Sequence, residues 1–379
     1  MKITGLELFH ISIPFAEPYH LSKVYGTRYD AESVILKVHT DQGIVGLGEA
    51  DPLNPFTEDT CASVIVVTRD MIAPHIIDQD PSDLAGLEYM LDQAVNGNLV
   101  ARSAVNMALF DIVGKANDIP AHLMLGGRYH DKLPIFRGIG SGSPEEDIVA
   151  IERELARGNK CIMIKMGSLP VSDEIKRMIA VKKKYGDRVP FVVDANQGWT
   201  VFEALAFVDG IRDYRPDLIE QPIYHKDIEG LKRIKERSPC PLSADESMQN
   251  LHDAATLIQE KAVDVFSLKV SKNGGLAKTK KIADVAETFG IKCLMNSMFE
   301  FGISQAASLQ VGCTLTNLLD FGHAYGSVTR MSDDITDFDQ NISPGFVTVP
   351  SGPGLGINLK EDKLKKYTKE YLKIGEPAE

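Results

Sequence analysis

The sequence contains few cysteines, no excess of positive charge and no long apolar runs. Five cysteines occur among 379 residues, and none forms a CxxC pair with another. Their odd number and wide spacing argue against a disulfide framework or a cysteine-ligated zinc site, and they favour a reducing compartment. We therefore expect a cytoplasmic protein. The cysteines are Cys61, Cys161, Cys240, Cys293 and Cys313.

Acidic residues outnumber basic ones by 53 to 41, which gives a formal net charge of −12. Such a chain repels phosphate backbones and anionic lipid surfaces, so we expect neither nucleic acid nor membrane as a partner. No apolar stretch approaches the ~18 residues of a membrane span. Residues 1–15 alternate apolar and polar positions, which is typical of a strand and not of a signal peptide. Walker-type phosphate loops and low-complexity linkers are also absent from the sequence.

The length is sufficient for a barrel of about 250 residues and a second domain. Residues 1–125 are expected to form an α+β capping domain, with an antiparallel sheet followed by helices over 56–118. Residues 126–325 are expected to form a β/α barrel. Residues 326–379 are expected to pack back on the capping domain and to end in a short charged helix. Between the first two strands, residues 16–30 are predicted to be a loop about as long as a flexible lid.

Five short apolar segments between residues 161 and 271 each end in an ionisable residue. These segments read CIMIKM, FVVDAN, DLIEQP, LSADES and VFSLKVS, and the ionisable residues are Lys165, Asp194, Glu220, Asp245 and Lys269. Successive members are 29, 26, 25 and 24 residues apart. That interval is about one strand, one helix and two loops, so the segments are predicted to be successive parallel strands. Each charge then lies at the carboxyl end of a strand, where β/α barrels carry their active sites.

Further apolar segments complete the expected barrel, at 133–140 before the five and at 292–298 and 318–322 after them. In this order Lys165 ends strand two and Lys269 ends strand six, on opposite sides of the barrel. The three carboxylates between them can converge on one hard divalent cation, Mg²⁺ or Mn²⁺. Each residue also has a simpler interpretation, because aspartates cap helices and lone lysines reach for solvent.

With these residues, the sequence resembles the enolase superfamily in its muconate-lactonizing subgroup. The shared segments are GIVGLGEA, NMALFDIVGK, LMLGG, VDAN, IEQP, SADES and KVSKNGG, together with Lys165. The resemblance implies a (β/α)7β barrel with an α+β cap, one Mg²⁺ per subunit, and abstraction of the proton α to a carboxylate. It further implies roles for individual residues. The metal ligands are Asp194, Glu220 and Asp245, supported by Asn196 and Glu246, and the acid/base pair is Lys165 and Lys269.

Two departures from the subgroup stand out. The usual Lys-x-Lys of strand two is Met163-Ile164-Lys165 here, so a lysine that would help to lower the pKa of its neighbour is missing. Mandelate-racemase-type sites place a histidine at the end of strand seven, where this chain has Asn296-Ser297. His323, beyond strand eight, is a weak substitute for which we expect a structural role.

The resemblance places substrate recognition in residues 19–29 and at the end of strand eight. The candidate substrate contacts are Tyr19, Lys23, Tyr25, Asn296, Glu300 and Asp320. Tyr19, Tyr25 and Tyr29 could box a cationic or ring-bearing amine, with Glu300 or Asp320 as its counter-charge. A core or surface role fits each of these residues equally well.

Two lysines on opposite faces favour racemisation or epimerisation of an amino-acid-like carboxylate. A dehydratase or a cycloisomerase would use the same first half-reaction with only one base. A binding protein on the same fold, without catalysis, is the alternative from another class. We expect a small-molecule carboxylate as the substrate and a homo-oligomer as the assembly.

Overall fold

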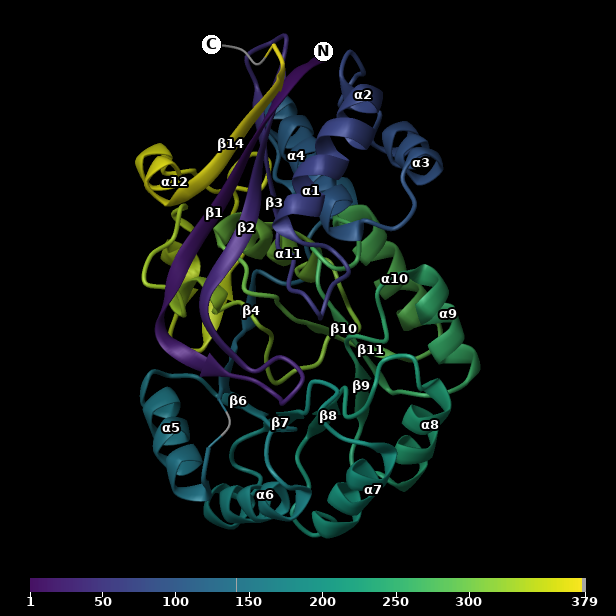
Figure 1. Ribbon diagram of the computed structural model, residues 1–379, viewed down its shortest axis with the longest axis vertical. Coiled ribbons are helices and arrows are strands. Elements are labelled where there is room, and N and C mark those ends of the chain that lie inside the picture. Colours follow the sequence, from purple (N-terminus) through teal and green to yellow (C-terminus); the bar gives the residue numbers. More distant parts are fainter. Residues whose placement is uncertain (141, 377–379) are drawn as a thin grey trace.

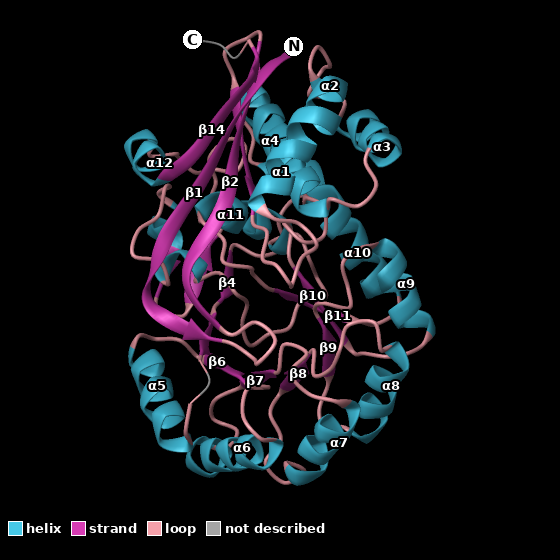
Figure 2. Cartoon of the chain, in the orientation of Figure 1, coloured by secondary structure: helices cyan, strands magenta, loops and turns pink. Residues whose placement is uncertain are grey.

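The computed structural model describes residues 1–140 and 142–376. Figure 1 shows a long twisted sheet with helices at one end of the molecule, and a ring of helices around parallel strands at the other end. Figure 2 shows that helices surround the strands of the barrel on their outer side. The predicted α/β architecture, a barrel with an α+β cap, is confirmed.

The capping sheet has four antiparallel strands in the order β14-β1-β2-β3. These are β1 (Ile3–His20), β2 (Thr27–Thr40), β3 (Val45–Ala50) and β14 (Thr368–Gly375). The predicted loop over 16–30 is corrected, because β1 and β2 continue through it and leave only 21–26 as a turn. Pairing is interrupted after Pro14 and resumes at Tyr19↔Arg28. Between these two points the Ala16 N–H donates to the Arg330 carbonyl oxygen and Phe15 forms a bridge with Met331, so the C-terminal segment pairs with this part of β1.

Helices cover one face of the capping sheet. They are α1 (Cys61–Val67), η1 (Thr68–Ile72), α2 (Ala73–Ile76), α3 (Leu84–Ala94) and α4 (Leu99–Asn117). The backbones of β3 and α4 are in direct contact, since a Cβ at Gly48 would lie 1.9 Å from the Ala104 carbonyl oxygen. A Cβ at Gly46 would lie 2.2 Å from the Ala108 carbonyl oxygen. Gly46 and Gly48 of the GIVGLGEA segment therefore permit this close packing.

The barrel sheet has seven parallel strands in sequence order, from β5 to β11. They are β5 (Phe136–Ile139), β6 (Cys161–Lys165), β7 (Phe191–Asp194), β8 (Leu218–Glu220), β9 (Leu242–Ala244), β10 (Val265–Leu268) and β11 (Lys292–Met295). Each strand is followed by a helix, as the sequence predicts. These are α5 (Pro144–Ala156), α6 (Val171–Tyr185), α7 (Val201–Gly210), α8 (Ile228–Arg237), α9 (Leu251–Gln259), α10 (Leu276–Thr288) and α11 (Gly302–Gly312).

The eighth barrel strand, expected at 318–322, is present only as isolated bridges. Leu318 pairs with Cys293 of β11, and His323 pairs with Ile135 next to β5. This segment therefore joins the two edges of the sheet without forming a regular strand. The segment expected as strand one is also divided, because residues before Ile135 form β4 (Lys132–Pro134) in a separate sheet of order β12-β13-β4.

The C-terminal tail returns to the capping domain, as expected. Its elements are η3 (Ser327–Thr329), η4 (Phe338–Asn341), β12 (Ile342–Ser343), β13 (Phe346–Thr348) and α12 (Glu361–Tyr367), and η2 (Ala121–Leu125) precedes the barrel. The expected charged helix is α12, but it is followed by β14, which pairs with β1. Most side chains of β14 are exposed, so the strand lacks the apolar alternation that would reveal it. None of the helices described is long and apolar enough to span a bilayer.

Candidate active site

Strand register brings the five ionisable residues together at the carboxyl ends of the barrel strands. Lys165 pairs with Asp194 between β6 and β7, and Asp194 pairs with Glu220 between β7 and β8. Glu220 pairs with Ser243 of β9, and Asp245 lies two residues further along the chain, in line with the period-two alternation of a strand. Lys269 directly follows β10. All five side chains are buried.

Lys165 is held by polar groups of β7 and the turn after it. Its ammonium group forms an ion pair with Asp194 and donates a hydrogen bond of 3.0 Å to Asn196 Oδ1. Burial alone would lower the pKa of Lys165, but Asp194, together with Tyr19 and Glu220, outweighs burial, so the pKa lies above its usual range. In this arrangement Lys165 is a cation that Asp194 and Asn196 both contact.

Lys269 is held by Asp245 and by an aromatic ring. Its Nζ lies 2.6 Å from Asp245 Oδ2 and 4.0 Å from the centre of the Phe56 ring. A second ammonium, Lys272 Nζ, lies 2.8 Å from Asp245 Oδ1 and also donates to the Ser267 carbonyl oxygen. Although burial opposes ionisation of Asp245, Lys269 and Lys272 lower its pKa to about 2. Lys272 was missed as a site residue, although it lies in the quoted KVSKNGG segment.

Glu220 lies between the other two carboxylates and accepts a hydrogen bond of 2.7 Å from Asn296 Nδ2. Burial and the charges of Asp194 and Asp245 raise its pKa well above the usual range. Three buried carboxylates from adjacent strands are costly without positive charge, and oxygen donors are the ligands that Mg²⁺ prefers. The residues present therefore fit one hard divalent cation.

A polar network joins the hairpin turn of the cap to this site. The Tyr25 hydroxyl donates a 2.9 Å hydrogen bond to Glu246 Oε1, and Gln197 Nε2 donates a 2.6 Å bond to the Tyr25 oxygen. Asn196 Nδ2 lies 3.5 Å from the same Glu246 oxygen. Burial and the nearby aspartates raise the pKa of Glu246 to about 8. The turn at 21–26 is thus fixed to the barrel by Tyr25.

A cavity of about 70 Å³ opens between the two lysines. Its charged lining residues are Lys165, Lys269, Arg137 and Arg330, and all four are basic. Burial and the nearby Arg330 lower the pKa of Arg137 to about 9. Sequence reasoning missed both arginines, because neither lies in a recognisable motif and only the fold brings them together. The uncharged lining residues include Tyr19, Tyr25, Phe56, Met163, Asn196 and Asn296.

Three candidate substrate contacts lie elsewhere. The Lys23 side chain is 58% exposed and lies 4.0 Å from Glu203, outside the cavity lining. Glu300 is buried and accepts hydrogen bonds from the Met298 backbone N–H and from Gln305. Asp320 is exposed and lines a different cavity with Lys160 and Pro190, which precede β6 and β7. Asp320 therefore lies at the opposite end of the barrel from the lysines.

His323 and Tyr29, which the sequence offered as a substitute catalytic histidine and as a possible substrate contact, lie outside the cavity lining. His323 is fully buried, and its Nδ1 accepts a 3.2 Å hydrogen bond from the Met295 backbone N–H. Burial lowers the pKa of His323 to about 3, so it is a neutral part of the barrel wall. Tyr29 is 67% exposed on β2.

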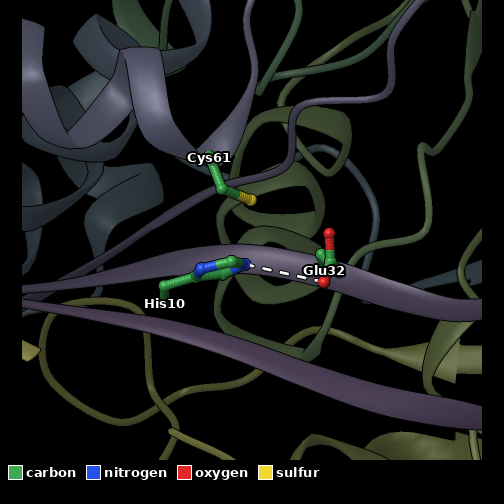
Figure 3. Close-up of side chains that lie close together, drawn as sticks. All are labelled: His10, Glu32 and Cys61. Atoms are coloured by element: carbon green, nitrogen blue, oxygen red, sulfur yellow. Dashed lines mark ion pairs between the residues drawn. The ribbon is translucent and has the colours of Figure 1, made fainter. Parts of the chain in front are cut away.

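A group of potential metal ligands also occurs in the cap, where His10, Glu32 and Cys61 place one ligand atom each within 4.8 Å of one another (Figure 3). Glu32 already forms an ion pair with Lys369, with 2.6 Å between Lys369 Nζ and Glu32 Oε1. Burial raises the pKa of the Cys61 thiol to about 12, which opposes the thiolate form that binds metals. These partners favour a structural role for the group.

Two family models match the chain. The mandelate racemase / muconate lactonizing enzyme N-terminal domain matches residues 3–126, and the enolase C-terminal domain-like model matches residues 147–363. The intermediate region contains β4 and β5. Together the two models cover strands β1, β2 and β3 of the capping sheet and the barrel strands that carry the five ionisable residues.

Characterised relatives match over nearly their whole length. An N-succinyl-L-Arg/Lys racemase from Bacillus cereus is 29% identical over 369 residues, covering 97% of this chain and 98% of the relative. The chloromuconate cycloisomerase CbnB from Cupriavidus necator is 31% identical over 372 residues, covering 97% and 100%. An L-Ala-D/L-Glu epimerase from Bacillus subtilis is 30% identical over 359 residues, covering 94% and 97%.

Solved structures agree with these matches. The crystal structure of the N-succinyl Arg/Lys racemase from Bacillus cereus superimposes with a TM-score of 0.94 at 28% identity, covering 98% of this chain and 100% of that one. Muconate lactonizing enzyme from Pseudomonas fluorescens, complexed with muconolactone, gives a TM-score of 0.93 at 31% identity, covering 97% and 99%. The similar proteins thus include both racemases and cycloisomerases.

Proposed function

Because the chain belongs to the mandelate racemase/muconate lactonizing enzyme family of the enolase superfamily, we propose that it racemises or epimerises an amino-acid-like carboxylate with two lysine bases. The family chemistry is abstraction of the proton α to a carboxylate. The observation that carries the proposal is that Lys165 and Lys269 line the same cavity from β6 and from the end of β10. A substrate carbon between them would have one amine on each face.

The family is typically dependent on a divalent metal, and Asp194, Glu220 and Asp245 are the proposed ligands of Mg²⁺, with Mn²⁺ as an alternative. When bound, the cation would stabilise negative charge that develops on the substrate carboxylate. Asn296, which donates a hydrogen bond to Glu220, would hold the Glu220 carboxylate in place. Asn196 and Glu246 would support the neighbouring groups through the network that includes Tyr25.

In the proposed reaction, one lysine in its neutral form takes the α-proton and the other, in its ammonium form, supplies a proton to the opposite face. The bond to the first proton breaks as its electron pair moves into the carboxylate to give an enolate, and the second proton restores the carbon with inverted configuration. The two roles exchange for the other enantiomer. Asp194 and Asn196 orient Lys165, whereas Asp245 and Phe56 orient Lys269.

A cycloisomerase is the second candidate, and a dehydratase would share its requirement for one base. Met163 supports this class of alternative, because it lines the cavity where the subgroup usually supplies another lysine. The 31% identity to a chloromuconate cycloisomerase supports it as well. Racemisation is favoured because a reaction with one base does not require the second amine that Lys269 presents to the cavity.

The proposal can be tested by NMR in D₂O with the purified protein and Mg²⁺. N-acylated amino acids, cyclic amino acids, betaines, dipeptides, hydroxy acids and muconates would be screened for exchange of the α-proton. Inverted configuration with incorporated deuterium is the expected product. Lactone formation or loss of water would favour the second candidate. Normal Mg²⁺ binding without exchange of any compound would contradict the proposal and leave a binding protein without catalysis.

A further inference from the structure

The active-site cavity has an excess of positive charge that the two-lysine reaction does not explain. We propose that Arg137 and Arg330 form a subsite for a second anionic group, so that the substrate is a dianion. This inference rests on the proposed function for the position of the first carboxylate. That carboxylate is accounted for by the proposed metal site, whereas the two guanidinium groups line the cavity from β5 and from the segment after η3.

Arg330 is the more available of the two guanidinium groups. It donates one hydrogen bond, of 2.9 Å, to the Gly138 carbonyl oxygen, and its Cζ lies 4.1 Å from the centre of the Tyr19 ring. Within the described part of the chain, no carboxylate lies within 4.0 Å of its nitrogens. A guanidinium has five N–H donors in a planar fork that matches a carboxylate. Arg330 therefore retains donors and an unneutralised charge at the cavity wall.

Arg137 is oriented by carbonyl groups and is only weakly neutralised. Its Nη1 donates bonds of 2.6 Å to the Gly326 carbonyl oxygen and 2.7 Å to Thr329 Oγ1. Its Nε lies 3.9 Å from Glu154, but that carboxylate is 2.8 Å from Arg157. Glu154 is thus shared, and it cannot neutralise Arg137 and Arg330 together. Two buried or half-buried guanidinium groups that face the same space are more stable when an anion lies between them.

The cavity between the lysines continues toward the arginines. A second cavity, of about 470 Å³, adjoins it and shares Tyr19, Arg137, Gly138 and Arg330 as lining residues. A Cβ at Gly138 would lie 2.7 Å from the Tyr19 hydroxyl and 2.9 Å from Arg330 Nη2. The absence of a side chain at Gly138 is therefore what lets these groups meet at the boundary.

The subsite replaces the expectation that tyrosines and a carboxylate box a cationic amine. Tyr19 does line the cavity, but its ring is already stacked with Arg330. Glu300 is bonded to Gln305, and Asp320 lines another cavity. Arg137 and Arg330 both line the boundary between the two cavities, and the one carboxylate of the described chain within 4.0 Å of them, Glu154, is shared with Arg157. This boundary therefore attracts a remote carboxylate more than a remote cation.

Calorimetric titration with matched ligands tests the subsite without requiring turnover. The probes are succinate, glutarate, adipate and pimelate, each compared with its own monoamide in the presence of Mg²⁺. The amide preserves the shape of the second group but removes its charge. Wild type is expected to prefer at least one diacid over its monoamide by roughly ten- to hundredfold, the range of a charge-assisted hydrogen bond. Arg330→Gln is expected to lose most of that preference, and Arg330→Lys part of it.

Arg153→Gln is the matched control, because Arg153 lines only the second cavity and is half exposed. It should retain the preference of wild type. Equal affinity for every diacid and its monoamide in wild type, or full preference in folded Arg330→Gln, would overturn the subsite. The exchange assay with N-succinyl amino acids and their N-succinamoyl counterparts separates this inference from the proposed function. A calorimetric preference for diacids without any α-proton exchange would support the subsite and contradict the proposed racemase. Equal exchange of the N-succinyl and the N-succinamoyl amino acids would support the racemase and contradict the subsite.

Discussion

Two of the three carboxylates between Lys165 and Lys269 are already paired with ammonium groups. Lys165 contacts Asp194, and both Lys269 and Lys272 contact Asp245. Glu220 has an amide partner in Asn296 instead. The lysines therefore neutralise the same oxygens that the proposed metal would use, so the protein can keep these buried charges folded before metal binds.

Neutral substitutions at the proposed ligands test the metal site. Asp194→Asn, Glu220→Gln and Asp245→Asn preserve side-chain shape but each removes a charged oxygen ligand. We expect each to lower Mg²⁺ affinity by at least roughly tenfold, measured by calorimetry, while circular dichroism shows a folded chain. Asp320→Asn at the other end of the barrel is the control and should bind Mg²⁺ as wild type does. Unchanged affinity in all three ligand variants would refute the assignment.

His323 gives the barrel a pH-dependent stability. Its pKa is about 3 in the folded protein and near 6.5 when unfolded, so unfolding takes up a proton between these values. The stabilising contribution is complete above pH ~6.5 and is lost as the pH falls toward 3. Across this window His323 should lower the free energy of unfolding by up to about 1.4 kcal/mol per pH unit.

Urea unfolding of wild type and His323→Asn between pH 7 and pH 5 measures this contribution. Asparagine can still accept the hydrogen bond from Met295, and all other titrating groups are common to both proteins. The variant should lose less stability than wild type over the same interval. Parallel pH dependence in the two proteins would show that His323 does not titrate as its burial indicates.

At the scale of elements, the turn between β1 and β2 connects the cap to the active site. Its backbone N–H at Lys23 donates to the Gly167 carbonyl oxygen, and the Ser22 hydroxyl donates to the Asn196 carbonyl oxygen. Tyr25 adds the bond to Glu246. The segment is therefore docked in this structure, although its length had indicated a lid.

Tyr25→Phe should loosen this turn while leaving the barrel intact. The change leaves Glu246 and Gln197 without the phenolic hydroxyl, at a cost of about 1–3 kcal/mol for the buried groups. Hydrogen exchange should become several-fold faster in the peptide containing residues 21–26. Tyr29→Phe, at an exposed position, is the control. Unchanged exchange of the turn in Tyr25→Phe would show that the backbone contacts alone hold it.

At the scale of the whole molecule, the parts that the sequence predicts are those with a local pattern. The five strand ends recur at nearly constant intervals, and the helices between them have periodic apolar positions. Arg137 and Arg330 line the same cavity although they are 193 positions apart in the chain, and no sequence pattern indicates that they lie close together. Strand β14 is similarly defined by its partner β1 and not by its own composition. Contacts between distant segments therefore account for most of what the sequence did not reveal.

The whole-chain similarity to racemases and cycloisomerases supports the common proton abstraction but leaves the second half of the reaction to be tested. The difference between racemisation and cycloisomerisation depends on whether the substrate carbon contacts two amines or one. Lys165 and Lys269 are therefore the residues whose removal distinguishes the two outcomes.

The most direct test measures α-proton exchange of each separate enantiomer of an accepted substrate in Lys165→Ala and Lys269→Ala. Each variant should abolish racemisation but retain exchange of one enantiomer, and the two variants should retain opposite enantiomers, because the surviving amine still serves its own face. Lys184→Ala, on the outer helix α6 and paired with Glu152, is the control and should racemise as wild type does. Wild-type racemisation in either active-site variant, or loss of exchange for both enantiomers in only one of them, would contradict the two-lysine mechanism.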